Sequence, residues 1–192
     1  MASRRKKALI LPESFYLDDD VVALAQKLLG MRLFTNIGGR ITGGIIIETE
    51  SYRAPEDRAS HAYGGRRTKR TEVMYKKGGI CYVYLCYGMH HLFNVITNVE
   101  GVPHAILIRA LKPIFGIETM QERRGKQKAL TEGPGTVSQA LGINLSLNGE
   151  PLFGPKVWIE KGSVEGNIVA SPRIGVDYAG PDALLPWRFQ LI

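Results

Sequence analysis

Residues 80–97 read ICYVYLCYGMHHLFNVIT, and this stretch decides the fold. Two runs rich in aromatic and β-branched residues, 80–87 and 91–97, flank a Gly-Met pair. That composition is typical of two strands that meet at a short turn. The sequence therefore predicts a β-hairpin, with the ring of Tyr87 projecting from its tip.

Further strands and helices are predicted on both sides of this hairpin. Residues 31–34 and 41–52 are rich in β-formers and joined by a turn-like Asn-Ile-Gly-Gly, so they predict a second hairpin. Apolar residues at helical spacing follow three aspartates and stop at Gly30, which predicts a helix of about 10 residues ending at Leu29. The other predicted elements are strands over 105–110 and 156–160, and helices over 117–124 and, behind a Gly-Pro-Gly breaker, 137–141.

These elements mix strands and helices without regular β-α-β alternation, which favours a mainly antiparallel α+β fold over a doubly wound sheet. At 192 residues, 44% of them hydrophobic, the chain is long enough to bury a core. We expect a single compact domain over residues 1–192, with a curved antiparallel sheet, flanking helices and the protruding hairpin. Residues 1–8 are expected to form a flexible basic tail.

The charge of the chain favours a polyanionic partner. There are 25 Lys and Arg residues against 18 Asp and Glu, a net charge of +7. Clustered cations gain free energy by displacing counterions from phosphates, although charge alone separates nucleic acid from an acidic membrane poorly. No apolar stretch approaches the roughly 20 residues of a spanning helix, and the apolar run behind the basic residues at 4–7 is short for a signal peptide. We expect an intracellular protein that does not bind membranes.

Neither the cysteines nor the histidines have the spacing of metal ligands. Cys81 and Cys86 occupy odd and even positions of one strand-like run, so they face opposite sides and no disulfide is expected between them. The adjacent His90 and His91 also point to opposite faces of a strand. No catalytic metal is expected.

Residues 44–52, GIIIETESY, place Glu48, Glu50 and Tyr52 on one face of a strand, because side chains alternate with a period of two. A glutamate kept ionised in a cleft by a nearby arginine can act as a general base toward water. A structural ion pair at a strand end explains the pattern equally well. A carbohydrate-cleaving pair of carboxylates is a third interpretation, because positions i and i+2 do not fix the separation that this mechanism needs.

Tyrosines and basic residues are interleaved between positions 52 and 87. Stacking platforms next to cations are what nucleic-acid binding uses. The alternative is that the strand tyrosines belong to the core and that the basic run is a solvated loop. Tyr87 fits this alternative least, because a ring at a hairpin tip can enter a base stack as a wedge. The residues are Tyr52, Tyr63, Tyr75, Tyr82, Tyr84 and Tyr87, with Arg53, Arg66, Arg67, Lys69, Arg70, Lys76 and Lys77.

A series of motifs runs through most of the chain in a distinctive order. They are Glu48-Thr49-Glu50-Ser51-Tyr52, Pro55-Glu56-Asp57, Ser60-His61, Tyr82-Val83-Tyr84, Tyr87-Gly88-Met89, Asn94, residues 107–113, Gly133-Pro134-Gly135 and Arg173-Ile174-Gly175-Val176. In order and spacing the chain resembles the alkyladenine (3-methyladenine) DNA glycosylase family. The resemblance implies a compact single domain of mixed helices and strands, whose hairpin inserts a tyrosine into the minor groove of double-stranded DNA, and an aromatic pocket for a flipped, damaged purine. It implies no metal, no cofactor and no lyase activity.

For catalysis the resemblance implies three residues. Glu50 resembles the general base, and Arg109 and the backbone carbonyl of Ile174 resemble groups that hold the nucleophilic water. An ionised Glu50 beside Arg109 would stabilise the oxocarbenium charge on the sugar and accept a proton from water. The pocket positions contain no lysine for a Schiff base. Simple hydrolysis to an abasic site is therefore implied, as in DNA glycosylases of the 3-methyladenine II type.

For binding the resemblance implies a pocket and a DNA-contacting rim. The pocket residues are Tyr52, His61, Tyr84 and Asn94, the last of which resembles the residue that disfavours the guanine amino group. The implied DNA contacts are Tyr87, which resembles the intercalating residue, Met89, Arg66, Arg70 and Gly135. Thr71 and Thr136 depart from the family's pattern, which often has Asn and a basic residue there, and these departures concern phosphate contacts more than catalysis.

Two other functions remain open on the sequence. A nonenzymatic damage sensor would use the same basic face and hairpin without needing Glu50 or Arg109. A hydrolase of small nucleosides or carbohydrates would not depend on Arg-rich loops. The resemblance favours a base-excision repair enzyme that works as a monomer in the bacterial cytoplasm, at the nucleoid. The basic residues at 4–7 weakly imitate a nuclear signal, so the nucleus would be expected in a eukaryote.

Overall fold

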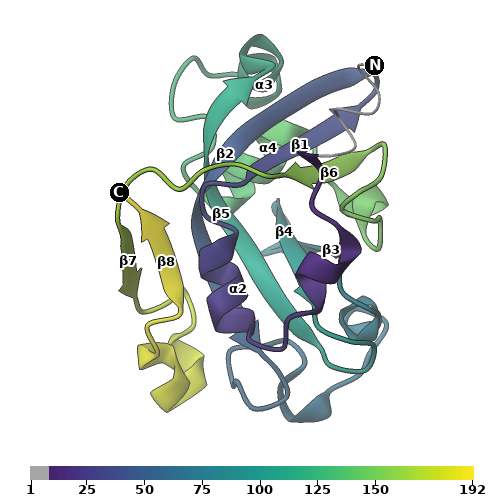
Figure 1. The fold of residues 1–192 in the computed structure, drawn as a ribbon, viewed down its shortest axis with the longest axis vertical. Coiled ribbons are helices and arrows are strands. Elements are labelled where there is room, and N and C mark those ends of the chain that lie inside the picture. The colour runs from purple at the N-terminus through teal and green to yellow at the C-terminus, as the bar shows by residue number, and fades with distance from the viewer. Residues whose placement is uncertain (1–8) are drawn as a thin grey trace.

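A curved antiparallel sheet dominates the computed structural model, which describes residues 9–192 (Figure 1). The strand order is β3-β4-β5-β2-β1-β6, with β8 paired to β2 and β7 to β8. The strands are β1 (Arg32–Ile37), β2 (Arg40–Arg53), β3 (Ile80–Cys86), β4 (His90–Thr97), β5 (His104–Phe115), β6 (Val157–Glu160), β7 (Ile168–Ser171) and β8 (Arg188–Leu191). The predicted single-domain α+β fold is confirmed, whereas the tail predicted at 1–8 lies outside the described residues.

Three α-helices of the described chain pack on the sheet: α2 (Val21–Lys27), α3 (Ile117–Arg124) and α4 (Pro134–Leu141). Asp20 caps α2, because its Oδ1 accepts the backbone N–H groups of the first turn at 3.0 and 2.9 Å. This helix ends at Lys27, two residues short of the prediction. α4 starts three residues earlier than predicted, because the fixed φ of Pro134 suits a first helical turn. Short 3-10 turns occupy Glu13–Leu17, Tyr63–Gly65, Glu72–Tyr75, Leu145–Leu147 and Asp177–Leu184.

Side-chain alternation gives the sheet two different faces. One face packs with α2 and α4 into the main core; its strand residues include Cys81, Val83, Phe93, Val95, Ile106 and Ile108. The intervening residues point to the other face; they are Tyr82, Tyr84, Leu92, Asn94, Ala105, Leu107 and Arg109. The apolar residues that bind the helices therefore also fix the direction of a row of aromatic and polar side chains.

Two β-bulges, one in β2 and one in β5, set the direction of two glutamates. The extra residue is Ile47 in β2 and Arg109 in β5. Without the bulge in β2, alternation from the buried Ile46 would turn Glu48 and Glu50 into the main core. With it, the intervening threonine faces the core instead and donates its hydroxyl to a carbonyl of α2 at 2.9 Å. Both carboxylates are thereby directed to the face opposite the helices.

The hairpin of β3 and β4 is formed as predicted. Its register runs from Ile80 opposite Ile96 to Cys86 opposite His90. The tip carries Tyr87 with a φ of 49°, and its side chain is 88% exposed. A left-handed conformation is costly for a residue with a Cβ atom. The backbone at Tyr87 is therefore strained where the turn exposes the ring.

The C-terminal ribbon was not predicted. β8 returns to β2 and pairs with residues 48–50, and β7 lies on its outer side (Figure 1). β5 is also longer than the predicted strand over 105–110, because it continues beyond the bulge to Phe115. Cys81 and Cys86 are both free thiols, as predicted. None of the helices within residues 9–192 combines the length and the apolar character needed to cross a membrane.

Candidate active site

The carboxylate of Glu50 is fully buried and meets donors from three parts of the chain. Its Oε1 accepts the backbone N–H of Ile174 at 2.8 Å and lies 3.2 Å from Nη1 of Arg109. Its Oε2 accepts the hydroxyl of Tyr52 at 2.8 Å. Burial and then the charge of Glu50 raise the pKa of Tyr52 well above its usual value, so this hydroxyl keeps the proton that it donates. All three partners donate, as an ionised carboxylate requires.

Arg109 joins Glu50 to Glu48. Its Nε donates to Oε1 of Glu48 at 2.8 Å, and Arg188 of β8 lies 3.6 Å from the same oxygen. Burial lowers the pKa of Arg109, but the charges of Glu50 and Glu48 more than offset this, so the pKa is raised. Two carboxylates and two guanidinium groups thus form a neutral cluster at the double bulge, which limits the cost of burying their charges.

A second buried ion pair supports the site from behind. Arg173 donates to both carboxylate oxygens of Asp57, at 2.5 and 2.9 Å, and both side chains are fully buried. The guanidinium carbon also lies 4.8 Å from the centroid of the Tyr52 ring and so covers one face of it. Because Ile174 follows Arg173 directly, this pair also holds the Ile174 N–H against Glu50.

His61 belongs to a chain of polar contacts between a tyrosine and an arginine. Its Nδ1 lies 2.9 Å from the hydroxyl of Tyr82, and its Nε2 lies 3.3 Å from Nη2 of Arg70. Burial, reinforced by the charges of Arg70 and Arg66, lowers the pKa of His61 to about 4, so the ring is neutral at pH 7. A guanidinium only donates. Nε2 is therefore the acceptor, and the ring proton sits on Nδ1, which donates to Tyr82.

A cavity of about 350 Å³ lies beside these groups, within the range of about 300–1,000 Å³ typical of small-molecule sites. Its aromatic walls are Tyr52, His61, Tyr82, Tyr84 and Tyr178. Asn94 also lines it, and the Asn94 side-chain amide donates to the backbone carbonyl of Tyr82 at 3.2 Å. The four predicted pocket residues therefore meet in one cavity. Glu50 is not part of its lining and lies directly behind Tyr52 and Arg109.

The predicted DNA contacts are placed around the mouth of this cavity or beyond it. Tyr87 lines the cavity from the hairpin tip, and the side chain of Met89 is exposed beside it. The guanidinium of Arg70 lies 4.7 Å from the centroid of the Tyr84 ring, so Arg70 also covers a pocket wall. Arg66 is exposed in the loop that precedes Arg70. A Cβ at Gly135 would lie 2.9 Å from the His90 ring, so glycine lets α4 pack against β4.

The two departures from the family's pattern have structural roles. The hydroxyl of Thr71 is buried; it accepts the backbone N–H of Thr68 at 2.8 Å and donates to the carbonyl of Arg66 at 3.0 Å. The hydroxyl of Thr136 contacts the N–H and the carbonyl of Gly133 at the start of α4. Each threonine thus closes a turn on which a predicted DNA contact stands.

Four residues of the site had no role assigned from the sequence. Tyr82 was named among the tyrosines that could stack but not among the pocket residues, although it has the same parity as Tyr84 in β3. Asp57 follows β2, but its partner Arg173 comes from the C-terminal segment. So does Tyr178, whose hydroxyl donates to the carbonyl of Ala59 at 3.1 Å. Nothing in the local sequence places that segment against β2. The family motifs contain both members of the Arg173–Asp57 pair without showing that they meet.

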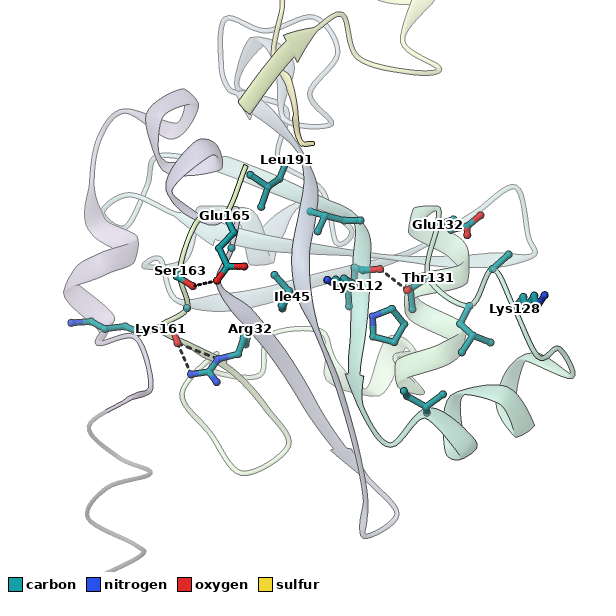
Figure 2. A pocket seen from close by; sticks show the side chains of 18 of the residues that line it. Arg32, Ile45, Lys112, Lys128, Thr131, Glu132, Lys161, Ser163, Glu165 and Leu191 are labelled. Atoms are coloured by element: carbon teal, nitrogen blue, oxygen red, sulfur yellow. Dashed lines mark hydrogen bonds between the residues drawn. The ribbon is translucent and has the colours of Figure 1, made fainter. Parts of the chain in front are cut away.

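A larger groove of about 900 Å³ lies farther along β2 and β5 and shares no lining residue with the aromatic cavity. Figure 2 shows Ile45 in its floor, with Arg32, Lys161 and Glu165 at one end and Lys128 and Glu132 at the other. It contains neither the buried carboxylate nor the stacked aromatic rings. Within the described residues, no group of three or more His, Cys, Asp or Glu side chains is placed to hold a metal ion.

The chain is similar to known proteins over most of its length. The family described as methylpurine-DNA glycosylase matches residues 14–192. A protein of Chlamydia felis, provisionally named 3-methyladenine DNA glycosylase, is 52% identical over 186 residues, covering 95% of this chain and 96% of its own. A Bacillus mycoides protein with the same provisional name is 46% identical over 192 residues, covering 93% of this chain and 94% of its own. The chain therefore belongs to the methylpurine-DNA glycosylase family.

Proposed function

We propose that this protein is a monofunctional DNA glycosylase of the 3-methyladenine II type, which flips damaged purines out of duplex DNA and hydrolyses their N-glycosidic bond. One observation carries the proposal. A buried carboxylate with three donors lies directly behind an aromatic cavity, and an exposed tyrosine stands at the mouth of that cavity. Tyr87 would fill the gap in the base stack while the extruded purine enters between the aromatic walls.

In the reaction Glu50 acts as the general base. The electron pair of the N-glycosidic bond leaves with the purine, and the sugar develops oxocarbenium character that the Glu50 charge stabilises. A cationic alkylated purine leaves as the neutral base, whereas a neutral lesion leaves as an anion that takes up a proton from solvent. The oxygen of a water molecule bonds to C1′ of the sugar, and Glu50 accepts its proton. The products are the free base and an abasic site. The carbonyl of Ile174 remains the proposed second partner of the water, next to the N–H of the same residue that Glu50 already accepts.

The Glu50 carboxylate is fully buried, so a water molecule reaches it only if one of its neighbours moves. The Arg109 contact at 3.2 Å is the longest, against 2.8 Å for Tyr52 and for the Ile174 N–H. Arg109 also lines the cavity, whereas Glu50 does not. The water therefore enters between the guanidinium and the carboxylate, where Arg109 donates to it and Glu50 accepts from it.

Base recognition rests on stacking more than on charge. One face of the Tyr52 ring carries Arg173, and one face of the Tyr84 ring carries Arg70. Both arginines already interact with the electron-rich face of a ring, so the two rings attract a cationic alkylated purine less strongly. Neutral lesions such as hypoxanthine and ethenoadenine are therefore substrates to test beside cationic ones. Asn94 is proposed to disfavour the guanine amino group.

Hydrolysis without a Schiff base is favoured because none of the residues lining the cavity is a lysine. A carbohydrate-cleaving pair is disfavoured, because Glu48 and Glu50 both contact Arg109 and leave no space for a sugar ring between them. A nonenzymatic sensor would need no buried carboxylate behind its pocket. The bacterial relatives suggest action on chromosomal DNA in a bacterial cytoplasm, and a monomer is expected.

The deciding experiment compares the wild type with Glu50→Gln on duplexes that each contain one hypoxanthine, ethenoadenine or 7-methylguanine, in the presence of a chelator. The wild type should release the base and leave alkali-labile abasic sites. Glu50→Gln should bind the duplex equally well but release the base at least about 100-fold more slowly, because general bases contribute about 10²–10⁴-fold. If the wild type binds DNA but releases none of these bases, the protein is a nonenzymatic damage sensor and not a glycosylase.

A further inference from the structure

The ion pair between Glu48 and Arg109 is placed to control access to Glu50. Arg109 makes its shorter contact, 2.8 Å, to Glu48 through Nε, and its longer contact, 3.2 Å, to Glu50 through Nη1. Arginine and carboxylate prefer a bidentate pair with two parallel hydrogen bonds. With Glu50 the guanidinium has only the single contact through Nη1, because the hydrogen bond from Nε to Glu48 fixes the orientation of the group.

Several neighbours hold Glu48 in place. The double bulge places Glu48 and Arg109 on the same face, since Arg109 is the extra residue of β5. Arg188 of β8 lies 3.6 Å from the Glu48 oxygen that Arg109 uses. Arg188 is itself fixed by the hydroxyl of Ser171 at 3.0 Å and by the side chain of Gln190 at 2.9 Å. Glu48 is therefore oriented by the C-terminal ribbon independently of Glu50.

We propose that Glu48 is a positioning residue, which holds the Arg109 guanidinium off the edge of the Glu50 carboxylate so that water reaches Glu50 from the cavity. This rests on the proposed glycosylase function. Glu48 does not line the cavity. Without the Glu48 oxygen, the Arg109 guanidinium is free to rotate, to present two of its nitrogens to Glu50 and to close the gap that the water needs.

The test compares Glu48→Gln, which keeps an acceptor oxygen for Arg109, with Glu48→Ala, which removes it. Single-turnover base release should fall on the order of 10- to 100-fold in Glu48→Ala, because small misplacements of catalytic groups have effects of this size. Glu48→Gln should restore most of the rate, and duplex affinity should match the wild type in both. Glu160→Gln is the matched control, since Glu160 is another buried glutamate, bonded to Trp158 on β6.

A second measurement does not depend on activity. The NMR signal of the Arg109 Nε–H should be protected from exchange in the wild type and in Glu48→Gln, and should broaden or disappear in Glu48→Ala. Wild-type rates in Glu48→Ala would overturn the proposal, as would a loss that follows reduced duplex affinity or a lowered melting temperature. A wild type that releases no base refutes the proposed function instead, and the Nε–H signal then still reports whether Glu48 holds Arg109.

Discussion

His61 shows how the chemistry of one residue depends on its surroundings. Its ring meets the Tyr84 ring edge-on at a centroid distance of 4.7 Å and forms part of the wall against which a base would stack. Burial and the charges of Arg70 and Arg66 lower its pKa from 6.5 to about 4. The folded state is therefore more stable with a neutral His61 ring than with a protonated one.

This preference predicts an acid dependence of stability. A histidine whose pKa is lowered on folding stabilises the fold above the unfolded value of 6.5 and loses that contribution as the pH falls toward about 4. In His61→Gln no proton can bind at this position, so the melting temperature should fall less steeply over the same window. Thermal unfolding of both proteins across this pH range checks it. Parallel curves would mean that His61 does not contribute.

For the individual residues around Glu50, the sequence predicted the residue types of the site better than the contacts between them. The face shared by Glu48, Glu50 and Tyr52 follows from strand alternation within β2, and the contacts of Arg109 and Tyr52 with Glu50 agree with it. The Ile174 N–H and the Arg173–Asp57 pair join segments 124 and 116 residues apart. No periodicity encodes such a pairing, so these contacts appear only in the folded chain.

Among the elements, the β3–β4 hairpin carries an exposed aromatic ring at its tip. Each boundary of its two strands was predicted to within one residue, because aromatic and β-branched residues flank a clear turn. The bulges in β2 and β5 were not predicted, because a single extra residue leaves no mark in a hydrophobic run. They nevertheless determine which face the glutamates occupy.

Because the backbone at Tyr87 is strained, a substitution there should affect the free energy of unfolding and the rate of base release differently. Its left-handed φ of 49° costs roughly 1–2 kcal/mol for a residue with a Cβ, whereas glycine loses roughly 0.5–1 kcal/mol in chain entropy. Tyr87→Gly should therefore leave the free energy of unfolding unchanged or raise it slightly. Base release should fall markedly, because a stacking ring is worth roughly 1–3 kcal/mol.

Denaturant unfolding and single-turnover assays on the same preparations measure both effects. Tyr63→Ala is the matched control, since Tyr63 is another exposed tyrosine but does not line the cavity. A Tyr87→Gly variant that releases the damaged base at the wild-type rate would show that the Tyr87 ring is not needed as a wedge in the base stack.

At the scale of the whole molecule, the net charge of +7 predicts salt-sensitive DNA binding. Each phosphate contact contributes about −0.9 to the slope of log affinity against log salt concentration. Arg66→Ala, in the exposed loop before Arg70, should reduce that slope by about 1. Lys128→Ala, in the distant groove of Figure 2, should leave it unchanged. Fluorescence anisotropy with an undamaged duplex at several salt concentrations gives the slopes, and equal changes in both variants would count against an oriented DNA face.

The return of β8 to β2 has a consequence for the enzyme during its synthesis. Glu50 is translated early, but the Ile174 N–H that it accepts, the Arg173 that supports Tyr52 and the Arg188 beside Glu48 all come from the last part of the chain. A nascent or prematurely terminated polypeptide that lacks these residues has the hairpin and the basic loop but an unfinished catalytic centre. A base-removing activity damages DNA if it is not controlled, and under the proposed function it would arise only after residues 173–188 have been synthesised.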